Sequence, residues 1–413
     1  MSLARSPLAP AAFPDLASID GVGMVTTNTG LRYRGRPDLL LMRFCEGTTA
    51  AGVFTRSKTR SAAVDWCRQA LAAGAGRARG LVVNSGNANA FTGARGQEGV
   101  RITIEAASRI LGCRPEEIFH ASTGTIGVPL DGPRIASCLE AMAPELSSEA
   151  SWEQAATAIS TTDTYPKGAG AETSIDGKTV RISGIAKGSG MIAPDMATML
   201  SFVVTDAAIA PDVLEALLRE GADRSFNSIT VDSDTSTSDT LLVFATGKAG
   251  NAPVTDLEDP RLDGFRAALF SVLLDLAHQV VRDGEGATRF VTVTVTGATS
   301  NDAAKRIALA IANSPLVKTA IAGADANWGR VVMAVGKSGE EADRDRLRIA
   351  IGGVVISENG EAVEGYDETP VAEHMKGQEI LIEADIGLGD GRATVWTCDL
   401  THAYIDINAD YRT

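Results

Sequence analysis

Hydrophobic residues follow two alternating patterns along the chain. The first is an apolar run of strand length that ends in small polar residues, as in GLVVNSGNANA from Gly80. In FVTVTVTGATS, the valines from Val291 to Val295 alternate with threonines, which is the period of a half-buried strand. Two further strands are predicted at residues 179–185 and 200–204.

The second pattern is helical. One predicted helix starts with Pro211 at its first position and stops at Gly221, and Asn301-Asp302 caps another. The predicted helices cover residues 97–111, 211–220, 265–281 and 301–312, and a further helix opens at Ser314-Pro315. Because strands and helices interleave over the whole length, the sequence predicts an α/β protein.

Composition narrows the class of protein. The 413 residues are 44% hydrophobic and 22% charged, as in globular proteins, and this length predicts two or three domains. The best boundary is residues 284–290, where a long helix gives way to a strand-rich segment. The apolar runs fall short of the ~18–20 residues that cross a bilayer, and the N-terminus lacks the apolar stretch of a signal peptide. We therefore expect a soluble protein with no membrane partner.

Charge and cysteine usage exclude further classes. With 38 basic and 52 acidic residues the net charge is −14, which argues against nucleic acid or an anionic membrane surface as a partner. The five cysteines are scattered and never spaced as CxxC, so the sequence has no zinc ribbon and no evident disulfide framework. This usage predicts a reducing, cytoplasmic location.

Histidine is scarce. Only four are present, and none forms an HExxH or HxxxH pair, so no metal site is predicted. If the protein is an enzyme, its nucleophile and base come from an unusual source.

A Gly-rich segment, AKGSGMIAPDMATMLSFVV, runs from Ala186 to Val204 between two predicted strands. A dinucleotide-binding fingerprint requires a helix after the glycines, so a nucleotide site is not favoured here. The alternative is an ordinary loop between strands.

Four other polar segments are candidates for chemistry. Ser122 to Gly124 lie in a predicted turn whose backbone amides are suited to an oxyanion, although such turns are more often structural. ISTTDTYPK contains Thr161, and Glu285 lies between two glycines, where a carboxylate is either solvated or aimed at an ammonium group. DSDTSTSDT, residues 232–240, spaces its acids like the start of an EF-hand but lacks the glycine and the final glutamate.

The C-terminal segment THAYIDINADYRT is predicted to hold a buried last strand. Tyr404, Ile405 and Ile407 supply its apolar positions, and residues 408–413 follow as a polar tail that is expected to fray.

The motifs taken together resemble those of one family. AAGVFTRSK, NSGNANAFTG, STGTIG, TTDTYPK, KGSGMIAPDMATML, GEGATRF, ANWGR and DINADYRT occur in the order found in the ornithine acetyltransferases, which include bifunctional glutamate N-acetyltransferases of arginine biosynthesis. The series spans nearly the whole chain, apart from about 20 N-terminal residues that fit poorly.

The resemblance implies self-cleavage between Ala197 and Thr198. Thr198 then becomes both the N-terminal residue of a second chain and the nucleophile, and its own α-amino group, with a reference pKa of ~7.7–8.0, serves as a base. A threonine of this kind needs no histidine. The resemblance thus implies two chains, residues 1–197 and 198–413.

The same resemblance implies roles for further residues. Thr123 and Gly124 would form the oxyanion hole. The implied substrate contacts are Thr161, Lys187, Thr198, Glu285, Asn408 and Thr413. We also expect Lys187 to pair with the carboxylate of an amino acid and Glu285 with its ammonium group.

The implied reaction is a ping-pong transfer. N-acetylornithine acetylates Thr198, ornithine leaves, and glutamate accepts the acetyl group. No cofactor is implied, and the use of acetyl-CoA as a second donor stays open.

The implied architecture is a layered α-β-β-α sandwich of the N-terminal-nucleophile kind, at about residues 20–286, with a smaller C-terminal α/β domain at about residues 287–413. The implied assembly is a heterotetramer of two cleaved protomers.

Some positions depart from the family pattern. Thr125 stands where an aliphatic residue is expected, Phe91 where cysteine is common, and Arg289 where lysine is usual. None of them touches the cleavage site. Two other functions stay open: a self-processing aminopeptidase or amidase, in which water takes the acyl group, and a non-catalytic metabolite-binding protein.

Overall fold

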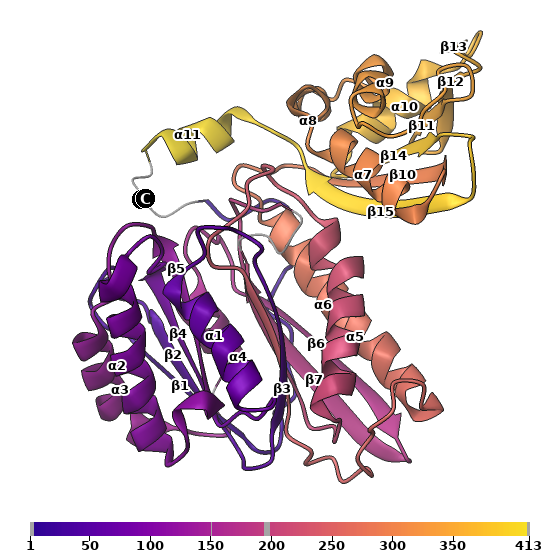
Figure 1. Cartoon of the computed structure of the whole chain (residues 1–413). Helices are drawn as coiled ribbons and strands as arrows, with labels where there is room; N and C mark the ends of the chain where they lie inside the picture. Colours follow the sequence, from indigo (N-terminus) through magenta and orange to yellow (C-terminus); the bar gives the residue numbers. More distant parts are fainter. Residues whose placement is uncertain (1–3, 150, 194–198, 411–413) are drawn as a thin grey trace.

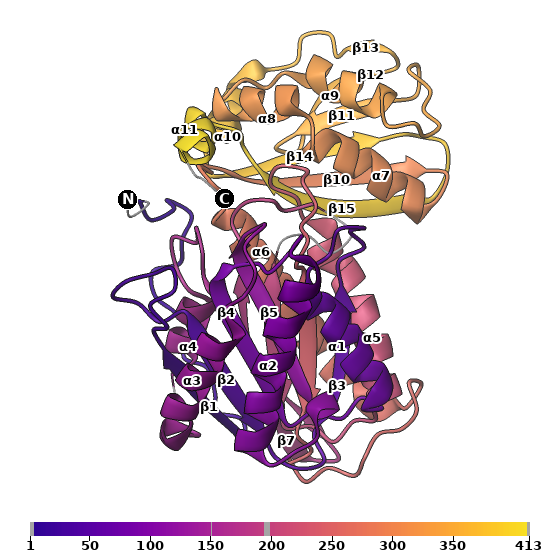
Figure 2. The same ribbon diagram turned by 60° about the vertical axis from the view of Figure 1, so that its left-hand side comes forward.

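Three β-sheets organise the protein (Figures 1 and 2). The structure is a computed structural model, which describes residues 4–149, 151–193 and 199–410. Two sheets lie face to face in one layered body, and the third, formed by the C-terminal part of the chain, lies beyond one end of that body.

The first sheet has the strand order β1-β2-β4-β5, in which β4 and β5 are parallel and the other pairs antiparallel. Its strands are β1 (Val22–Thr27), β2 (Leu39–Phe44), β4 (Gly80–Asn87) and β5 (Ile118–Thr125). Helices α2 (Gly93–Leu111) and α3 (Gly132–Met142) cover its outer face, where their apolar residues join a core with alternate residues of β2 and β4.

The second sheet has the order β3-β9-β8-β7-β6, in which β8 and β9 are parallel. Its strands are β3 (Thr49–Phe54), β6 (Lys167–Ile175), β7 (Lys178–Lys187), β8 (Leu200–Thr205) and β9 (Thr240–Ala245). Helices α5 (Pro211–Arg224) and α6 (Asp263–Arg282) cover its outer face.

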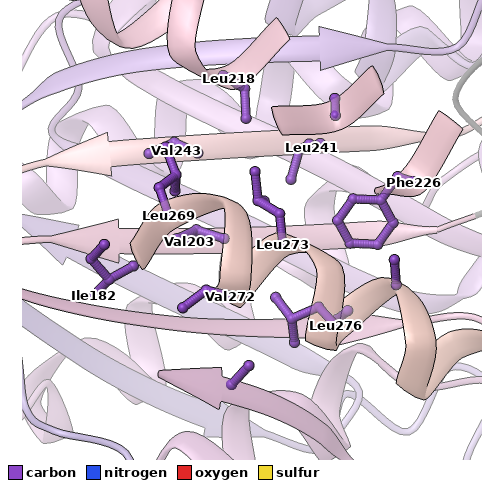
Figure 3. Close-up of a cluster of buried hydrophobic side chains, with 14 of the residues drawn as sticks. Ile182, Val203, Leu218, Phe226, Leu241, Val243, Leu269, Val272, Leu273 and Leu276 are labelled. Carbon is purple, nitrogen blue, oxygen red and sulfur yellow. The ribbon is translucent and has the colours of Figure 1, made fainter. Parts of the chain in front are cut away.

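Figure 3 shows how α6 packs on this sheet. Leu269, Leu273 and Leu276 follow one another along the helix face and contact a core that contains Val203 and Leu241. Residues 260–282 are long and apolar enough to cross a membrane. However, half of the most apolar stretch within them is buried inside the molecule. α6 is therefore the central core helix of this layer.

The inner faces of the two sheets meet in a second core. Phe44 of β2 stacks on Phe244 of β9 with ring centroids 4.3 Å apart, so the contact joins the two sheets directly. Helices α1 (Ala62–Ala73) and α4 (Trp152–Ile159) close the edges of this core and contact both sheets. The order helix, sheet, sheet, helix confirms the predicted α-β-β-α sandwich.

The third sheet has the order β13-β12-β11-β14-β10-β15 and a core of its own. Its strands are β10 (Phe290–Ala298), β11 (Arg348–Ile351), β12 (Val354–Glu358), β13 (Glu361–Ala362), β14 (Glu379–Asp385) and β15 (Gly391–Cys398). Its helices are α7 (Asn301–Ala312), α8 (Pro315–Ala322), α9 (Trp328–Gly336) and α10 (Glu368–Lys376). After β15 the chain turns back toward the sandwich and forms α11 (His402–Asp410) (Figure 1).

The strand predicted in the C-terminal segment is wrong, because the segment forms α11. Thr401, Tyr404 and Ile407 are the half-buried positions, and their spacing of three is helical, whereas Ile405 is 63% exposed. The alternation of Tyr404, Ile405 and Ile407 was too short to distinguish period 2 from period 3.6.

Two predicted helix boundaries also shift. The helix predicted at residues 97–111 begins at Gly93. The helix predicted to stop at Gly221 continues to Arg224. A Cβ at Gly221 would lie only 2.6 Å from Leu273 of α6, which explains why this helical position is a glycine. This glycine permits close helix packing and does not end the helix.

Candidate active site

The predicted site residues that the structure describes meet in one pocket at the end of the sandwich. The pocket encloses about 90 Å³ and receives side chains from β5, β7, α11 and the loops between them. Its lining contains Thr123, Gly124, Thr161, Lys187, Glu285 and Asn408, together with Ala88, Ile126, Thr162, Gly190, Met191, Ser236, Thr237 and Ser238. Ala197, Thr198 and Thr413 lie outside the described residues.

The sequence predicted that Thr123 and Gly124 lie in a turn. This prediction is wrong, because both residues belong to the end of β5. The strand extends this far because β5 runs parallel to β4, with Ser122 opposite Asn84 and Gly124 opposite Gly86. Gly124 has φ +127°, and a Cβ there would lie 2.3 Å from the carbonyl carbon of Gly86. Only glycine therefore allows the two strand ends to approach so closely.

Lys187 ends β7 and is the cation of the pocket. It is 3% exposed, and its Nζ donates a hydrogen bond to Thr123 Oγ1 at 3.3 Å. Burial lowers the pKa of Lys187, and nearby carboxylates, Asp163 first, oppose that shift. An anionic ligand group placed here gains a buried ionic partner.

Glu285 supplies the opposite charge. It follows α6, and its backbone N–H donates to Ser189 O at 2.9 Å, which ties this loop to the one after β7. Asn408 of α11 donates from Nδ2 to Glu285 Oε2 at 2.7 Å. Gly190 leaves room for this carboxylate, since a Cβ there would lie 2.5 Å from Glu285 Oε2.

Both described ends of the segment predicted to be cleaved are held by aspartates. Asp232 accepts the backbone N–H groups of Met191 and Ile192 at 2.6 and 2.8 Å. Asp239 accepts the N–H of Met199 at 3.1 Å. Asp239 is fully buried, and burial raises its pKa well above the ordinary value.

The aspartates and the hydroxyls of Ser236, Thr237 and Ser238 are functional candidates that the sequence reasoning missed. All of them come from residues 232–240, which were tested only against the EF-hand pattern. The available signal was a run of acidic and hydroxyl residues directly before the apolar strand β9. Side chains of residues in this position lie at the end of the sheet.

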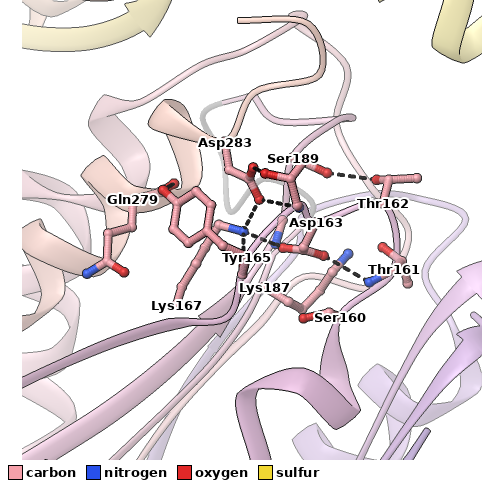
Figure 4. A network of polar contacts seen from close by, with 12 residues as sticks. Ser160, Thr161, Thr162, Asp163, Tyr165, Lys167, Lys187, Ser189, Gln279 and Asp283 are labelled. Atoms are coloured by element: carbon pink, nitrogen blue, oxygen red, sulfur yellow. Dashed lines mark hydrogen bonds and ion pairs between the residues drawn. The ribbon is translucent and has the colours of Figure 1, made fainter. Parts of the chain in front are cut away.

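Thr161 and Thr162 lie in the loop between α4 and β6 (Figure 4). Thr161 N–H donates to Asp163 Oδ2 at 2.9 Å, and the hydroxyls of Thr162 and Ser189 are 2.7 Å apart. The loops after α4, β7 and α6 are thus joined by hydrogen bonds at the pocket.

Among the residues that the structure describes, the pocket combines one cation, one carboxylate, several hydroxyls and a few apolar side chains. This set would suit a small zwitterion, with Lys187 available for its carboxylate, Glu285 for its ammonium group, and Met191 and Ile126 for its methylenes. Within residues 4–149, 151–193 and 199–410, no group of three or more His, Cys, Asp or Glu side chains converges as a metal site would require. The individual roles of these residues stay predictions.

Comparisons with known proteins agree with one another. Residues 23–413 match the model of the ArgJ family. The arginine biosynthesis bifunctional protein ArgJ of Rhizobium meliloti is 59% identical over 415 residues, covering 100% of both chains. Its counterpart in Gluconobacter oxydans is 58% identical and covers 98% of this chain and 96% of that protein. Among solved structures, the arginine biosynthesis bifunctional protein argJ of Bacillus halodurans is 43% identical, with a TM-score of 0.49, and covers 51% of this chain and 98% of its own.

Proposed function

The chain belongs to the ArgJ family of arginine-biosynthesis acetyltransferases, and from this premise we propose that it transfers the acetyl group of N-acetylornithine to glutamate through an acetyl-Thr198 intermediate. The observation that carries the proposal is the pocket itself, in which Lys187 and Glu285 provide opposite charges beside Thr123 and Gly124. Opposite charges beside an oxyanion site fit the binding of a zwitterionic amino acid and the stabilisation of a developing oxyanion.

The first step is cleavage of the peptide bond between Ala197 and Thr198. The Thr198 hydroxyl attacks the Ala197 carbonyl, the C–N bond breaks, and the nitrogen takes up the hydroxyl proton, which frees the α-amine of Thr198 and leaves Ala197 as an ester on the Thr198 oxygen. Water then hydrolyses this ester to a carboxylate on Ala197 and restores the Thr198 hydroxyl. The hydrogen bonds of Asp232 to Met191 and Ile192 and of Asp239 to Met199 support this step, because they fix the chain on both sides of the bond.

Acetyl transfer then uses the new amine as a base. It takes the proton of the Thr198 hydroxyl, whose oxygen attacks the acetyl carbonyl of N-acetylornithine. Ornithine leaves as an amine after receiving that proton, and the acetyl group stays as an ester on Thr198. In the second half-reaction the neutral amine of glutamate attacks this ester, the ester C–O bond to Thr198 breaks, and the proton lost by the amine passes to the Thr198 oxygen, which regenerates the hydroxyl.

The remaining residues bind and stabilise. Thr123 and Gly124 stabilise the oxyanion of both tetrahedral intermediates, and the ammonium of Lys187, 3.3 Å from Thr123 Oγ1, reinforces that positive environment. Glu285, which accepts a hydrogen bond from Asn408, binds the free ammonium group of N-acetylornithine or ornithine, and Thr161 and Thr413 complete the substrate contacts.

Intact-mass measurement of the purified protein tests the cleavage. We expect chains of 197 and 216 residues, which together make up the 413-residue sequence. Thr198→Ala should remain a single chain without acetyl transfer. Thr179→Ala, an exposed threonine at the far end of β7, is the matched control and should be cut normally. Cleavage that persists in Thr198→Ala would refute the mechanism.

A second experiment separates the proposal from its alternative, a self-processing aminopeptidase or amidase. An acetyltransferase consumes N-acetylornithine in proportion to added glutamate, whereas a hydrolase releases acetate without any acceptor. Replacing N-acetylornithine with acetyl-CoA in the same assay shows whether the protein is bifunctional.

Light scattering tests the proposed heterotetramer of two 1–197 and two 198–413 chains.

A further inference from the structure

A buried ion cluster lies beside the pocket (Figure 4). Lys167 opens β6, and its Nζ lies 2.6 Å from Asp163 Oδ1 and 2.6 Å from Asp283 Oδ2. The three side chains are at most 1% exposed. Two carboxylates therefore share one ammonium group away from water, an arrangement that is tolerated only when further hydrogen bonds satisfy the remaining oxygen lone pairs.

Asp163 also accepts hydrogen bonds from backbone N–H groups of the pocket segments. Its Oδ2 accepts Thr161 N–H at 2.9 Å, and its Oδ1 accepts Gly188 N–H at 2.6 Å. Thr161 lines the pocket, and Gly188 directly follows Lys187, the cation of the pocket. A single carboxylate thus sets two pocket segments, distant in sequence, at a defined separation.

Asp283 uses its lone pairs on the opposite side. Its Oδ2 accepts Thr164 N–H at 2.9 Å, and its Oδ1 accepts the Thr164 hydroxyl. Ser6 covers this side, with its N–H donating to Thr164 Oγ1 at 2.9 Å and its hydroxyl to Arg282 O at 2.6 Å. Asp283 therefore faces the N-terminal segment and is not among the described residues that line the substrate pocket.

Asp163 and Lys167 stabilise each other's charge, whereas burial, together with the charge of Asp163, raises the pKa of Asp283 despite the nearby ammonium group of Lys167. Burial alone would raise the pKa of Asp163, but Lys167 and Lys187 outweigh it and hold that pKa well below its usual value. Burial opposes the charge of Lys167 as well, and the two carboxylates, Asp163 first, raise its pKa above the ordinary value. Asp163 is accordingly an ionised acceptor for all of its donors at neutral pH.

We propose that Asp163 is the positioning residue of the substrate pocket: it fixes Thr161 and Lys187 relative to each other, while Lys167 and Asp283 hold its carboxylate in place. The inference rests on the proposed acetyl transfer. Asp163 does not touch the substrate. Its effect reaches the substrate through the backbone of Thr161 and Gly188 and through its negative charge near Lys187.

Two isosteric substitutions form a matched test, since each removes one of the two negative charges that pair with the ammonium group of Lys167. In Asp163→Asn, every neighbour of the side chain is a donor, so the new NH₂ group has to face an N–H or the ammonium group of Lys167. In Asp283→Asn, the amide oxygen keeps Lys167 and Thr164 N–H, and the NH₂ group donates to Thr164 Oγ1. Only the first substitution disrupts the pocket backbone.

Steady-state kinetics with N-acetylornithine and glutamate provide the readout. We expect Asp163→Asn to raise KM by about tenfold to a hundredfold, as for the loss of a charged hydrogen bond, with a smaller change in kcat. Asp283→Asn should change KM by less than about threefold. Equal KM changes in the two variants would show that only the charge matters and would overturn the inference. A wild-type protein without acetyl transfer would instead refute the proposed function.

Hydrogen exchange on the wild-type protein covers the case in which Asp163→Asn does not fold. The Thr161 and Gly188 amides lie in loops but donate to a buried carboxylate, so they should exchange as slowly as amides of the neighbouring strands. Exchange at the rate of open loop amides would overturn the inference without any variant.

Discussion

Gly124→Ala tests how closely the ends of β4 and β5 have to approach for the pocket to work. The added Cβ would lie 2.3 Å from Gly86 C and 2.6 Å from Asn87 N, and both of these atoms are backbone. Carbon atoms pack at about 3.5 Å, so the end of β4 must retreat by roughly 1 Å. The residue would also keep φ +127°, which side chains rarely adopt.

The structure sets the size of two effects. Overpacking of this kind costs about 1–3 kcal/mol, and the strained backbone adds about 1–3 kcal/mol, so the free energy of unfolding should fall by roughly 2–6 kcal/mol. A shift of about 1 Å in a catalytic group lowers the rate by roughly a hundredfold, and we expect a loss of that order in kcat for acetyl transfer.

Gly127→Ala is the matched control, because Gly127 also has positive φ, at +87°, but within the described parts of the chain no atom beyond its sequence neighbours lies within 4 Å of its Cβ position. It should incur only the backbone cost and keep kcat close to that of the wild type. Thermal unfolding and the glutamate-dependent transfer assay measure both variants. If Gly124→Ala and Gly127→Ala lose the same stability and activity, the close approach of the strands is irrelevant and the reasoning is wrong.

Two further predictions concern other parts of the site. Gly190→Ala places a Cβ 2.5 Å from Glu285 Oε2, and because that carboxylate is the end of a flexible side chain, the variant should keep its unfolding midpoint while KM rises by about tenfold or more, as measured by steady-state kinetics. His120 is fully buried, and burial lowers its pKa to about 4, so the unfolded chain binds a proton between pH ~6.5 and pH 4 that the folded chain does not. Stability should therefore fall as the pH falls through this window. In uncut Thr198→Ala chains, His120→Gln should reduce that slope by up to ~1.4 kcal/mol per pH unit, and an unchanged slope in denaturation curves would contradict the assignment.

The layers of the fold were predictable because periodicity reports which side of an element is buried. Val291 to Val295 and residues 200–204 form strands as expected, and α6 covers residues 265–281. The prediction failed where the spacing of the apolar residues did not match the spacing of the buried positions. α11 rests on the sandwich through only a few half-buried side chains, so its apolar positions imitate a strand.

The site was predictable only in part, for a topological reason. The resemblance singled out Lys187 and Glu285, but nothing local to either residue shows that the ends of β7 and α6 lie together. Asp163 and Asp239 were missed because they act on backbone amides, and a hydrogen bond to the backbone leaves no spacing pattern in the sequence. Their signal is burial, and burial appears only after the strands have been assembled.

The strand order of the second sheet has a consequence for how the mature enzyme is made. β8 and β9, which follow the proposed cleavage site, are inserted between β3 on one side and β7 and β6 on the other, all of which precede it. A 198–413 chain synthesised on its own would have to insert two parallel strands into a gap that the 1–197 chain cannot keep open without them. Folding must therefore come before cutting, and the two chains, once separated by denaturation, are expected not to reassemble into active enzyme. The covalent link between the two segments is therefore needed for folding, and the cleavage reaction removes it.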